Sequence, residues 1–343
     1  MPMNATSAPV HAAERGDAPY ADTAVVLVNL GTPDAPTATA VRRYLAEFLH
    51  DHRVVSLTRW LWCPLLHFVI LPLRGPKVAH KYASIWLADD ARGPGGSPLA
   101  VHTRRLAQAV QRELPGVRVV DAMRYGNPNV RTLLQRLRGD GVRRVLALPL
   151  YPQYSTSTTA SVGDVLERAD GLATRMVGDY HLDAGWIEAV AMSIRDYRAR
   201  HGDGGHLLFS FHGLPQRLVD QGDPYAAQCE ASAAAIAAAL GLEPSQWTLS
   251  YQSRFGRERW LEPSTSDTLA ALAGRGIRTV DVAAPGFAVD CLETLEEVAM
   301  MLAEEFAGHS AGGSLRYIPC LNDRPDHARA LAAIARRELE AWR

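Results

Sequence analysis

The chain has 343 residues, with 36 basic and 37 acidic side chains and a formal net charge of −1 at pH 7. This balance gives no global electrostatic case for nucleic-acid binding. The length and a hydrophobic content of 47% predict a globular protein of two domains or lobes. The four cysteines, at positions 63, 229, 291 and 320, form no C-x-x-C pair, which favours a reduced cytoplasmic protein over a disulfide framework.

The first half of the chain alternates between strand and helix patterns. The Ala- and Pro-rich residues 1–21 have no apolar run and are predicted to be a disordered tail. Residues 22–162 are predicted to form an N-terminal lobe that carries an apolar insertion at about 52–98. Within this lobe we expect strands at 24–30, 117–122 and 142–150, and helices at 37–50, about 76–86, from about 98 to 113, and 130–138.

The second half repeats this order. Residues 163–318 are predicted to form a C-terminal lobe with strands at 207–211, 248–251 and 279–284 and a helix at 292–306. A last helix at about 325–342, within residues 319–343, is expected to pack back on the first lobe. Alternation of this kind predicts an α/β fold of two Rossmann-like lobes, each a parallel sheet flanked by helices.

The two halves also resemble each other in sequence. VVLVNLGTP at 25–33 matches LLFSFHGLP at 207–215, so that Gly31 aligns with Gly213 and Leu30 with His212. Arg124-Tyr125-Gly126 matches residues 254–256, and GVRRVLALPLYPQ at 141–153 matches GIRTVDVAAPGFA at 276–288. Three matches in the same order predict two similar half-molecules with a ligand cleft between them.

The apolar segment 61–73, LWCPLLHFVILPL, lies in the extra stretch of the first half. Its 13 residues and two internal prolines are too short for the about 20 residues that span a bilayer. The segment is either a hydrophobic lip over the cleft, able to rest on a membrane surface, or an ordinary buried helical hairpin.

His212 follows a predicted strand, where ligands bind in open parallel sheets. A hydrogen-bonded core histidine would satisfy the same pattern. The segment PGFAVDCLETLEE at 285–297 begins another helix, and it places Glu293 and Glu297 one turn apart on one helix face. Acidic residues also favour helix N-termini for electrostatic reasons alone. The sequence has no G-x-G-x-x-G, Walker A, structural-zinc or G-x-S-x-G pattern.

Five segments together resemble the ferrochelatase family, whose members insert Fe²⁺ into protoporphyrin IX and release two protons. They are VLVNLGTPDAPT (26–37), LPLYPQYSTSTTAS (148–161), SFHGLPQR (210–217), YQSRFGRERWLEPST (251–265) and PGFAVDCLETLEE (285–297). The resemblance covers about residues 25–319 and implies two Rossmann-like lobes around a porphyrin cleft.

The resemblance also implies roles for single residues. His212 would contact the metal and accept a pyrrole proton, Glu293 would be the opposing acid and metal ligand, and Glu297 would extend an acidic track. The expected substrate-binding residues are Leu30, Arg74, Ser97, Arg124, Tyr125 and Trp260. Protoporphyrin IX and Fe²⁺ would be substrates, and no group would be permanently bound.

Three positions depart from relatives. Some relatives have Tyr or Met in place of Leu30, some have His in place of Cys291, and others hold a [2Fe–2S] cluster with C-terminal cysteines and, in animals, a cysteine in place of Thr156. Because this chain has only Cys320 near its end, we expect no cluster.

Two other functions stay open at this point. One is a related chelatase for cobalt and a cobalamin precursor or for coproporphyrin III, and the other is a haem-binding sensor suggested by Cys63-Pro64. The absence of Tyr at Leu30 favours protoporphyrin. The sequence does not predict the oligomeric state or the strength of membrane association. The expected location is the cytoplasm, with peripheral contact at the inner face of the membrane.

Overall fold

The structure is a computed structural model of the chain that describes residues 20–342 except 56, 255 and 257. The predicted disordered tail therefore lies outside the described residues, apart from Tyr20 and Ala21. Tyr20 packs against the largest hydrophobic core, so the folded part of the chain begins before the predicted boundary at residue 22.

The first lobe is built on a four-stranded parallel sheet in the order β2-β1-β3-β4. Its elements are β1 (Thr23–Thr32), α1 (Ala38–Leu49), α2 (Arg59–Leu65), the π-helix η1 (Leu66–Ile70), α3 (Leu71–Ile85), α4 (Pro98–Glu113), β2 (Arg118–Gly126), α5 (Val130–Gly139), β3 (Arg144–Pro149), α6 (Thr159–Leu166) and β4 (Ala173–Met176).

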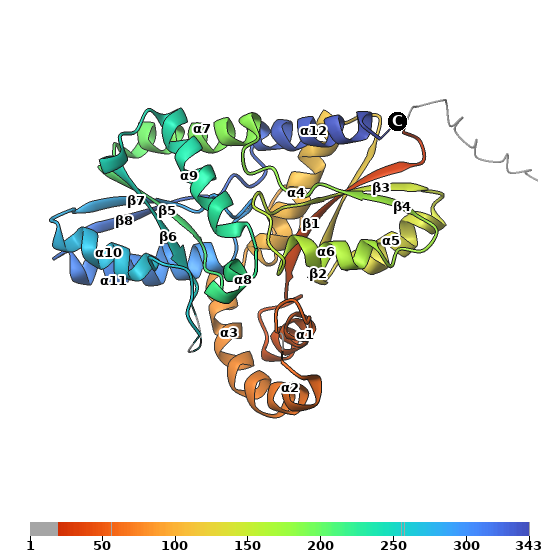
Figure 1. Cartoon of the computed structure of the whole chain (residues 1–343), viewed down its shortest axis with the longest axis horizontal. Coiled ribbons are helices and arrows are strands. Elements are labelled where there is room, and N and C mark those ends of the chain that lie inside the picture. The colour runs from red at the N-terminus through yellow and green to blue at the C-terminus, as the bar shows by residue number, and fades with distance from the viewer. Residues whose placement is uncertain (1–19, 56, 255, 257, 343) are drawn as a thin grey trace, which may run out of the picture.

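The second lobe repeats this arrangement with the order β6-β5-β7-β8. Its elements are α7 (Ala184–His201), β5 (His206–His212), α8 (Gln216–Asp220), α9 (Tyr225–Leu240), the 3₁₀-helix η2 (Pro244–Gln246), β6 (Trp247–Gln252), α10 (Thr265–Gly274), β7 (Thr279–Ala283), the π-helix η3 (Glu293–Leu302), α11 (Ala303–His309), β8 (Ser314–Ile318) and α12 (Pro325–Glu340). The predicted fold of two similar parallel-sheet lobes is confirmed, and Figure 1 shows the lobes side by side.

The predicted lobe boundary at residue 162 is wrong. β4 pairs with β3 along Arg144–Ala147, so the first sheet continues to Met176. A four-residue strand with partly exposed side chains gave no apolar run for sequence analysis to detect. By its place in the sheet, β4 corresponds to β8, and the second lobe begins after it.

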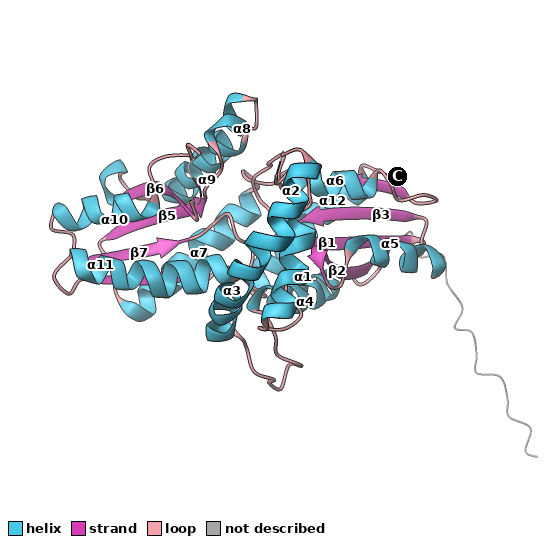
Figure 2. Cartoon of the chain, turned by 90° about the horizontal axis from the view of Figure 1, so that it is seen from below, coloured by secondary structure: helices cyan, strands magenta, loops and turns pink. Residues whose placement is uncertain are grey.

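Alternate side chains of β1 point to opposite faces of the first sheet and belong to different hydrophobic cores. Val25 and Leu27 of β1 join a core that runs through both lobes under α4, α7, α9 and α12. Ala24 and Val26 join a core on the opposite face of the first sheet. Helix α12 packs on α4 and β3 of the first lobe as well as on α7 of the second, and it thereby ties the lobes together (Figure 2).

The glycine of each Gly-x-Pro repeat is required because the chain passes very close to a neighbouring strand. A Cβ atom on Gly31 would lie 1.7 Å from the backbone oxygen of Tyr125, and one on Gly213 would lie 2.7 Å from that of Gln252. Any side chain there would force the two strands apart. The repeat therefore marks the same backbone packing in both lobes.

Strand pairing corrects one of the three internal matches. Gly31 stands opposite Tyr125 in the first sheet, and His212 stands opposite Gln252 in the second. Because His212 precedes the glycine equivalent to Gly31, Gln252 corresponds to the residue before Tyr125. The residue before Tyr125 is Arg124, and the internal match in the sequence pairs it with Arg254, two positions after Gln252. Residue 255 lies outside the described residues.

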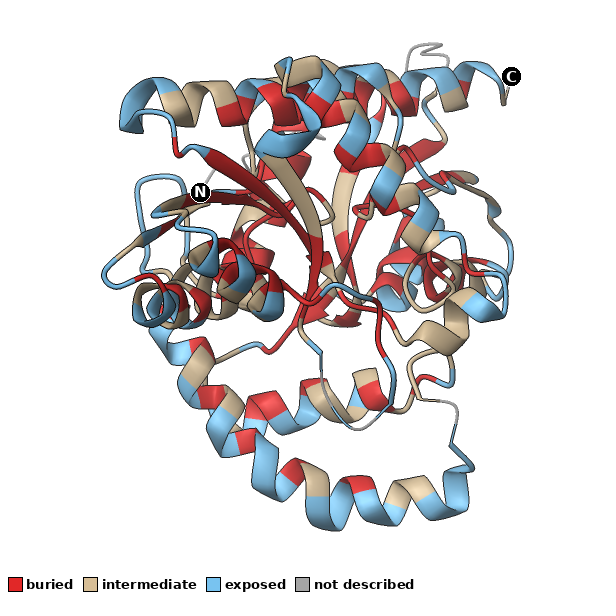
Figure 3. Ribbon diagram, turned by 60° about the vertical axis from the view of Figure 1, so that its left-hand side comes forward, coloured by how far each residue is buried: buried red, intermediate tan, exposed pale blue. Residues whose placement is uncertain are grey.

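Helices α1, α2, η1 and α3 project from the body of the molecule (Figures 1 and 3). The predicted helix at 76–86 is the end of a longer helical run that begins at Arg59 and passes through the apolar segment. Several large side chains of this run are exposed, including Trp60, Leu61, Phe68 and Leu73, whereas Leu66 and Leu71 are buried. We call residues 59–73 the apolar lip.

Candidate active site

His212 is the last residue of β5, an interior strand of the second sheet, and so lies at the carboxyl end of that strand. Its Nδ1 lies 2.6 Å from the backbone oxygen of Gly213. Because a carbonyl can only accept, Nδ1 carries the hydrogen, and Nε2 keeps a lone pair that can take a proton or contact a metal. The hydroxyl of Tyr225 donates to the backbone oxygen of His212 at 3.1 Å, which fixes the end of the strand.

Glu297 lies in η3 and is held by Ser253 after the end of β6. The backbone N–H and the hydroxyl of Ser253 each donate to a Glu297 oxygen at 2.6 Å. Ser253 reaches this position with φ of 64°, in the left-handed region that non-glycine residues seldom adopt. Sequence analysis missed Ser253, whose only structural signal is this backbone conformation.

Electrostatics connects Glu297 to His212. Burial raises the pKa of Glu297 above its usual value, while the bonds from Ser253 and the charge of His212 act in the opposite direction. A carboxyl group of this kind holds a proton more readily than a free glutamate does. The resemblance implies Glu293 as the acid opposite His212, and in the structure the charge of His212 also acts on Glu297.

Glu293 acts on groups of both lobes. After burial, its charge is the next cause that raises the pKa of Tyr82 in α3, and it also acts on Tyr44 in α1. Its charge raises the pKa of Glu297 as well. Its backbone oxygen accepts a hydrogen bond from the Gln252 side chain at 2.8 Å. The two acids of η3 therefore influence each other, and Glu293 also acts on the helices at the base of the lip.

Arg124 and Tyr125 belong to a buried network around Asp51, which sequence analysis did not single out. The Arg124 guanidinium, the Tyr125 hydroxyl and the Ser161 hydroxyl all donate to the same Asp51 oxygen, at 2.6, 2.7 and 2.7 Å. Burial alone would raise the pKa of Asp51, but these bonds hold it below the usual value. Tyr125 is fully buried, so in this structure it supports the wall of the site and is not part of an open surface.

The remaining predicted residues lie in separate parts of the structure. Leu30 is half-buried near the end of β1, and Ser97 is buried, where its hydroxyl accepts from Thr32 at 2.7 Å. Arg74 is exposed on α3. Trp260 is buried, and one edge of its ring would lie 3.1 Å from a Cβ on Gly213, so it packs beside His212.

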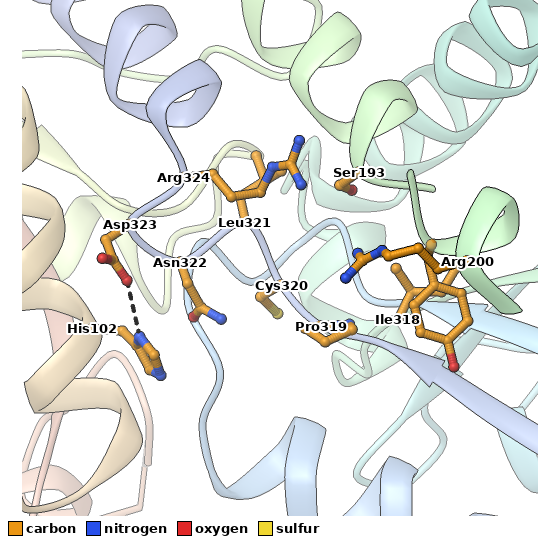
Figure 4. Close-up of a pocket in the computed structure, with 11 residues that line it drawn as sticks. His102, Ser193, Arg200, Ile318, Pro319, Cys320, Leu321, Asn322, Asp323 and Arg324 are labelled. Carbon is orange, nitrogen blue, oxygen red and sulfur yellow. Dashed lines mark hydrogen bonds and ion pairs between the residues drawn. The ribbon is translucent and has the colours of Figure 1, made fainter. Parts of the chain in front are cut away.

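Within the described part of the chain, no three His, Cys, Asp or Glu side chains form a group that could hold a metal ion. A cavity of about 330 Å³ lies elsewhere, among α4, α7 and the loop after β8 (Figure 4). Asp323 in its wall pairs with His102 at 3.4 Å and with Arg92 at 2.9 Å. None of His212, Glu293 or Glu297 lines this cavity, so we do not place the reaction there.

Comparison with known proteins gives one consistent result. The ferrochelatase family matches residues 22–339. The ferrochelatase of Stenotrophomonas maltophilia is 58% identical over 93% of this chain and 98% of its own length, and that of Xanthomonas axonopodis pv. citri is 56% identical over 92% and 98%. A solved structure of CbiX, described as the terminal enzyme for biosynthesis of siroheme in denitrifying bacteria, has a TM-score of 0.51 at 16% identity, covering 71% of this chain and 94% of that one. This last likeness concerns the fold alone.

Proposed function

This chain belongs to the ferrochelatase family, and from that premise we propose that it is a lyase that inserts Fe²⁺ into protoporphyrin IX. The reaction exchanges the two pyrrole N–H protons for one ferrous ion and forms protohaem, in the terminal step of haem biosynthesis. The observation that supports the proposal beyond family membership is the free Nε2 of His212 at the carboxyl end of β5, together with the electrostatic interaction of His212 with Glu297 in η3.

The residue types match what this exchange needs. The free Nε2 of His212 accepts the first pyrrole proton. The partly buried carboxyl group of Glu297, which holds a proton more readily than a free glutamate does, then takes up a proton. Imidazole and carboxylate ligands hold Fe²⁺ without the tight grip of a thiolate cluster, so the metal can pass to the porphyrin nitrogens. We assign His212, Glu293 and Glu297 to metal and proton handling.

We assign the porphyrin to the space bordered by Leu30, Trp260 and the apolar lip, with Arg74 as a cation for a propionate. Arg124, Tyr125 and Ser97 are then positioning residues, because their polar groups are engaged inside the protein.

The apolar lip also supports a proposal of peripheral membrane contact. Phe68 is 81% exposed and Trp60 72%, on the part of the chain that projects furthest from the sheets. In the described residues, none of the helices combines the length and apolar content needed to cross a bilayer. An exposed apolar patch beside the substrate site suits a lipid-soluble substrate. We propose a cytoplasmic protein that touches the membrane through this lip.

We further propose that the protein works without a resident [2Fe–2S] cluster. Such a cluster takes four protein ligands, and the four cysteines lie in α2, in α9, before η3 and after β8. The iron content of purified protein and the EPR spectrum after reduction test this. A [2Fe–2S] signal that Cys320→Ser removes would contradict the proposal.

Turnover of defined substrates tests the function. Purified protein is incubated with Fe²⁺ or Co²⁺ and with protoporphyrin IX or coproporphyrin III, and the shift of the Soret band is followed. We expect kcat/KM to be highest for Fe²⁺ with protoporphyrin IX. A preference for coproporphyrin III or for cobalt would identify a related chelatase, and tight haem binding without turnover would identify a sensor.

The His212→Ala variant tests the assignment of the base. Loss of a general base costs about 10²–10⁴ in rate, so we expect kcat to fall at least that far, with protoporphyrin binding retained when it is measured by fluorescence quenching. A turnover rate close to that of the wild type would show that His212 is a hydrogen-bonded core histidine and takes no part in the reaction.

A further inference from the structure

Cys63 differs from the other cysteines of this chain. Cys229, Cys291 and Cys320 are buried, whereas Cys63 in α2 is partly exposed. All four cysteines of the sequence are among the described residues. A thiol-directed reagent in solution therefore reaches Cys63 before any of the others.

A histidine lies against this thiol. The Sγ atom of Cys63 is 3.6 Å from Nε2 of His50, the residue that ends α1. On the other side of the ring, Nδ1 lies 2.5 Å from the backbone oxygen of Ala46. Because that carbonyl can only accept, Nδ1 carries the ring hydrogen, and Nε2 is the acceptor for the thiol proton. Cys63 is thus the nucleophile, His50 is the base beside it, and the carbonyl of Ala46 orients that base.

A permanent cation lies beside the pair. The Arg59 guanidinium donates to the backbone oxygen of His50 at 3.4 Å, and the ring of His67 lies 5.1 Å from the ring of His50. On the α1 side, the neighbouring Asp51 is engaged by Arg124. The positive charge of Arg59 attracts an anionic reagent toward the Cys63 thiol.

We propose that Cys63 is a nucleophilic thiol, paired with His50, that undergoes exchange with a small anionic disulfide such as glutathione disulfide. The thiol proton passes to Nε2 of His50, and the Cys63 thiolate attacks one sulfur of the disulfide. The S–S bond of glutathione disulfide breaks, and the leaving glutathione thiolate takes the proton back from the imidazolium. The products are a mixed disulfide on Cys63 and one reduced glutathione.

The position of Cys63 gives this modification a consequence that rests on the proposed function. Cys63 lies in the apolar lip, where α2 folds back against the end of α1. A charged tripeptide attached there separates the two helices and interferes with the approach of an apolar disc. Modified protein should therefore have a raised KM for protoporphyrin, and dithiothreitol should reverse the change.

The test measures thiol chemistry, so its outcome does not depend on chelatase activity. Native protein is incubated with glutathione disulfide at neutral pH, and the rate at which one glutathionyl group is added is followed by intact-protein mass spectrometry. Peptide mapping should place the group on Cys63. His50→Asn should lower the rate about 10²-fold, the low end of a general-base contribution, and His67→Asn should lower it less.

A further arm separates the proposal from a merely exposed cysteine. Arg59→Gln should slow the reaction with glutathione disulfide more than that with neutral 2-hydroxyethyl disulfide, and circular dichroism should show that each variant is folded. Modification of His50→Asn at the wild-type rate, or equal labelling of the three buried cysteines, would overturn the proposal.

Discussion

At the scale of single residues, the site depends on two short hydrogen bonds from Ser253 to one carboxyl group. They hold the Glu297 carboxyl in place and oppose the effect of burial on its pKa. Ser253 is the residue that follows the strand partner of His212, so its place is set by sheet register and not by a recognisable motif.

Removing the Ser253 hydroxyl should shift the proton chemistry of Glu297. Since its bond lowers the pKa of Glu297, Ser253→Ala should raise that pKa further, and the limb of the kcat–pH profile that reports Glu297 should move to higher pH. Ser266→Ala, which removes a similar bond to Glu305 away from the site, serves as the control. An unchanged profile in Ser253→Ala would separate Glu297 from the reaction.

A buried histidine far from the site should govern part of the acid stability. His327 is fully buried in α12, and burial lowers its pKa from 6.5 to about 4, while the backbone oxygen of Asn322 partly offsets this by accepting from Nδ1. Between these pH values the unfolded chain binds the proton more tightly, so stability is full above pH 6.5 and falls as the pH drops toward 4. The loss from this residue is about 3 kcal/mol.

Urea unfolding at pH 7 and pH 5 measures this effect. His327→Asn keeps a donor near the position of Nδ1 but has no titrating ring, so its stability should change less between the two pH values than that of the wild type. His80→Asn, on an exposed face of α3, should behave as the wild type does. The same pH dependence in all three proteins would show that His327 does not contribute.

At the scale of elements, helix α3, whose first residues belong to the apolar lip, is joined to the acid-bearing helix η3. Val41, Ala79 and Tyr82 form a small core with Leu292 and Leu295 beside η3. Beside this apolar contact, Lys81 of α3 forms an ion pair with Glu296 of η3 at 2.8 Å. Movement of the lip is thereby linked to the helix that carries Glu293 and Glu297.

Breaking this ion pair should affect substrate binding more than stability. Lys81 is partly exposed, so solvent screening limits the stability coupling with Glu296 to about 0.5–1 kcal/mol in a double-mutant cycle with Lys81→Met and Glu296→Gln. We expect KM for protoporphyrin to rise several-fold in either single variant, with a smaller change in kcat. Arg118→Met, which breaks the pair with Asp140 at the far end of β2, should change neither constant. If breaking the Arg118–Asp140 pair changed KM as much as breaking the Lys81–Glu296 pair does, the ion pair between α3 and η3 would have no specific role in substrate binding.

At the scale of the whole molecule, two lobes share one core while the lip projects from it. Helix α12 and the shared core hold the lobes together, so the apolar lip is the part of the fold with the least support from the sheets. Neighbouring leucines in the lip have opposite environments. Leu65 is 45% exposed, and Leu66 is fully buried.

This contrast makes a matched pair of variants. Leu65→Asp should reduce association with liposomes and raise KM for protoporphyrin, with little change in melting temperature, because its carboxylate stays in water. Leu66→Asp should lower the melting temperature strongly, because a buried unpaired carboxylate costs several kcal/mol. A large loss of stability in Leu65→Asp would show that this face of the lip is part of the core.

The sequence by itself determined the internal repeat, the parallel α/β lobes and the segment that holds each main functional group. These follow from local constraints: apolar runs that must be buried, and glycines at Gly31 and Gly213 where no side chain fits. His212 at a strand end and the acids at 293 and 297 were predicted for the same reason.

Only the tertiary structure decided which of those groups meet. Strand register places Gln252 where the internal match predicts Arg254, and it sets Ser253, which binds Glu297, directly after the strand partner of His212. It also revealed Asp51 as the hub for Arg124 and Tyr125 and extended the first lobe to Met176. The physical reason is that each of these contacts joins segments far apart in the chain. Their geometry follows from backbone hydrogen bonds between strands and from the packing of both lobes, neither of which leaves a local pattern in the sequence.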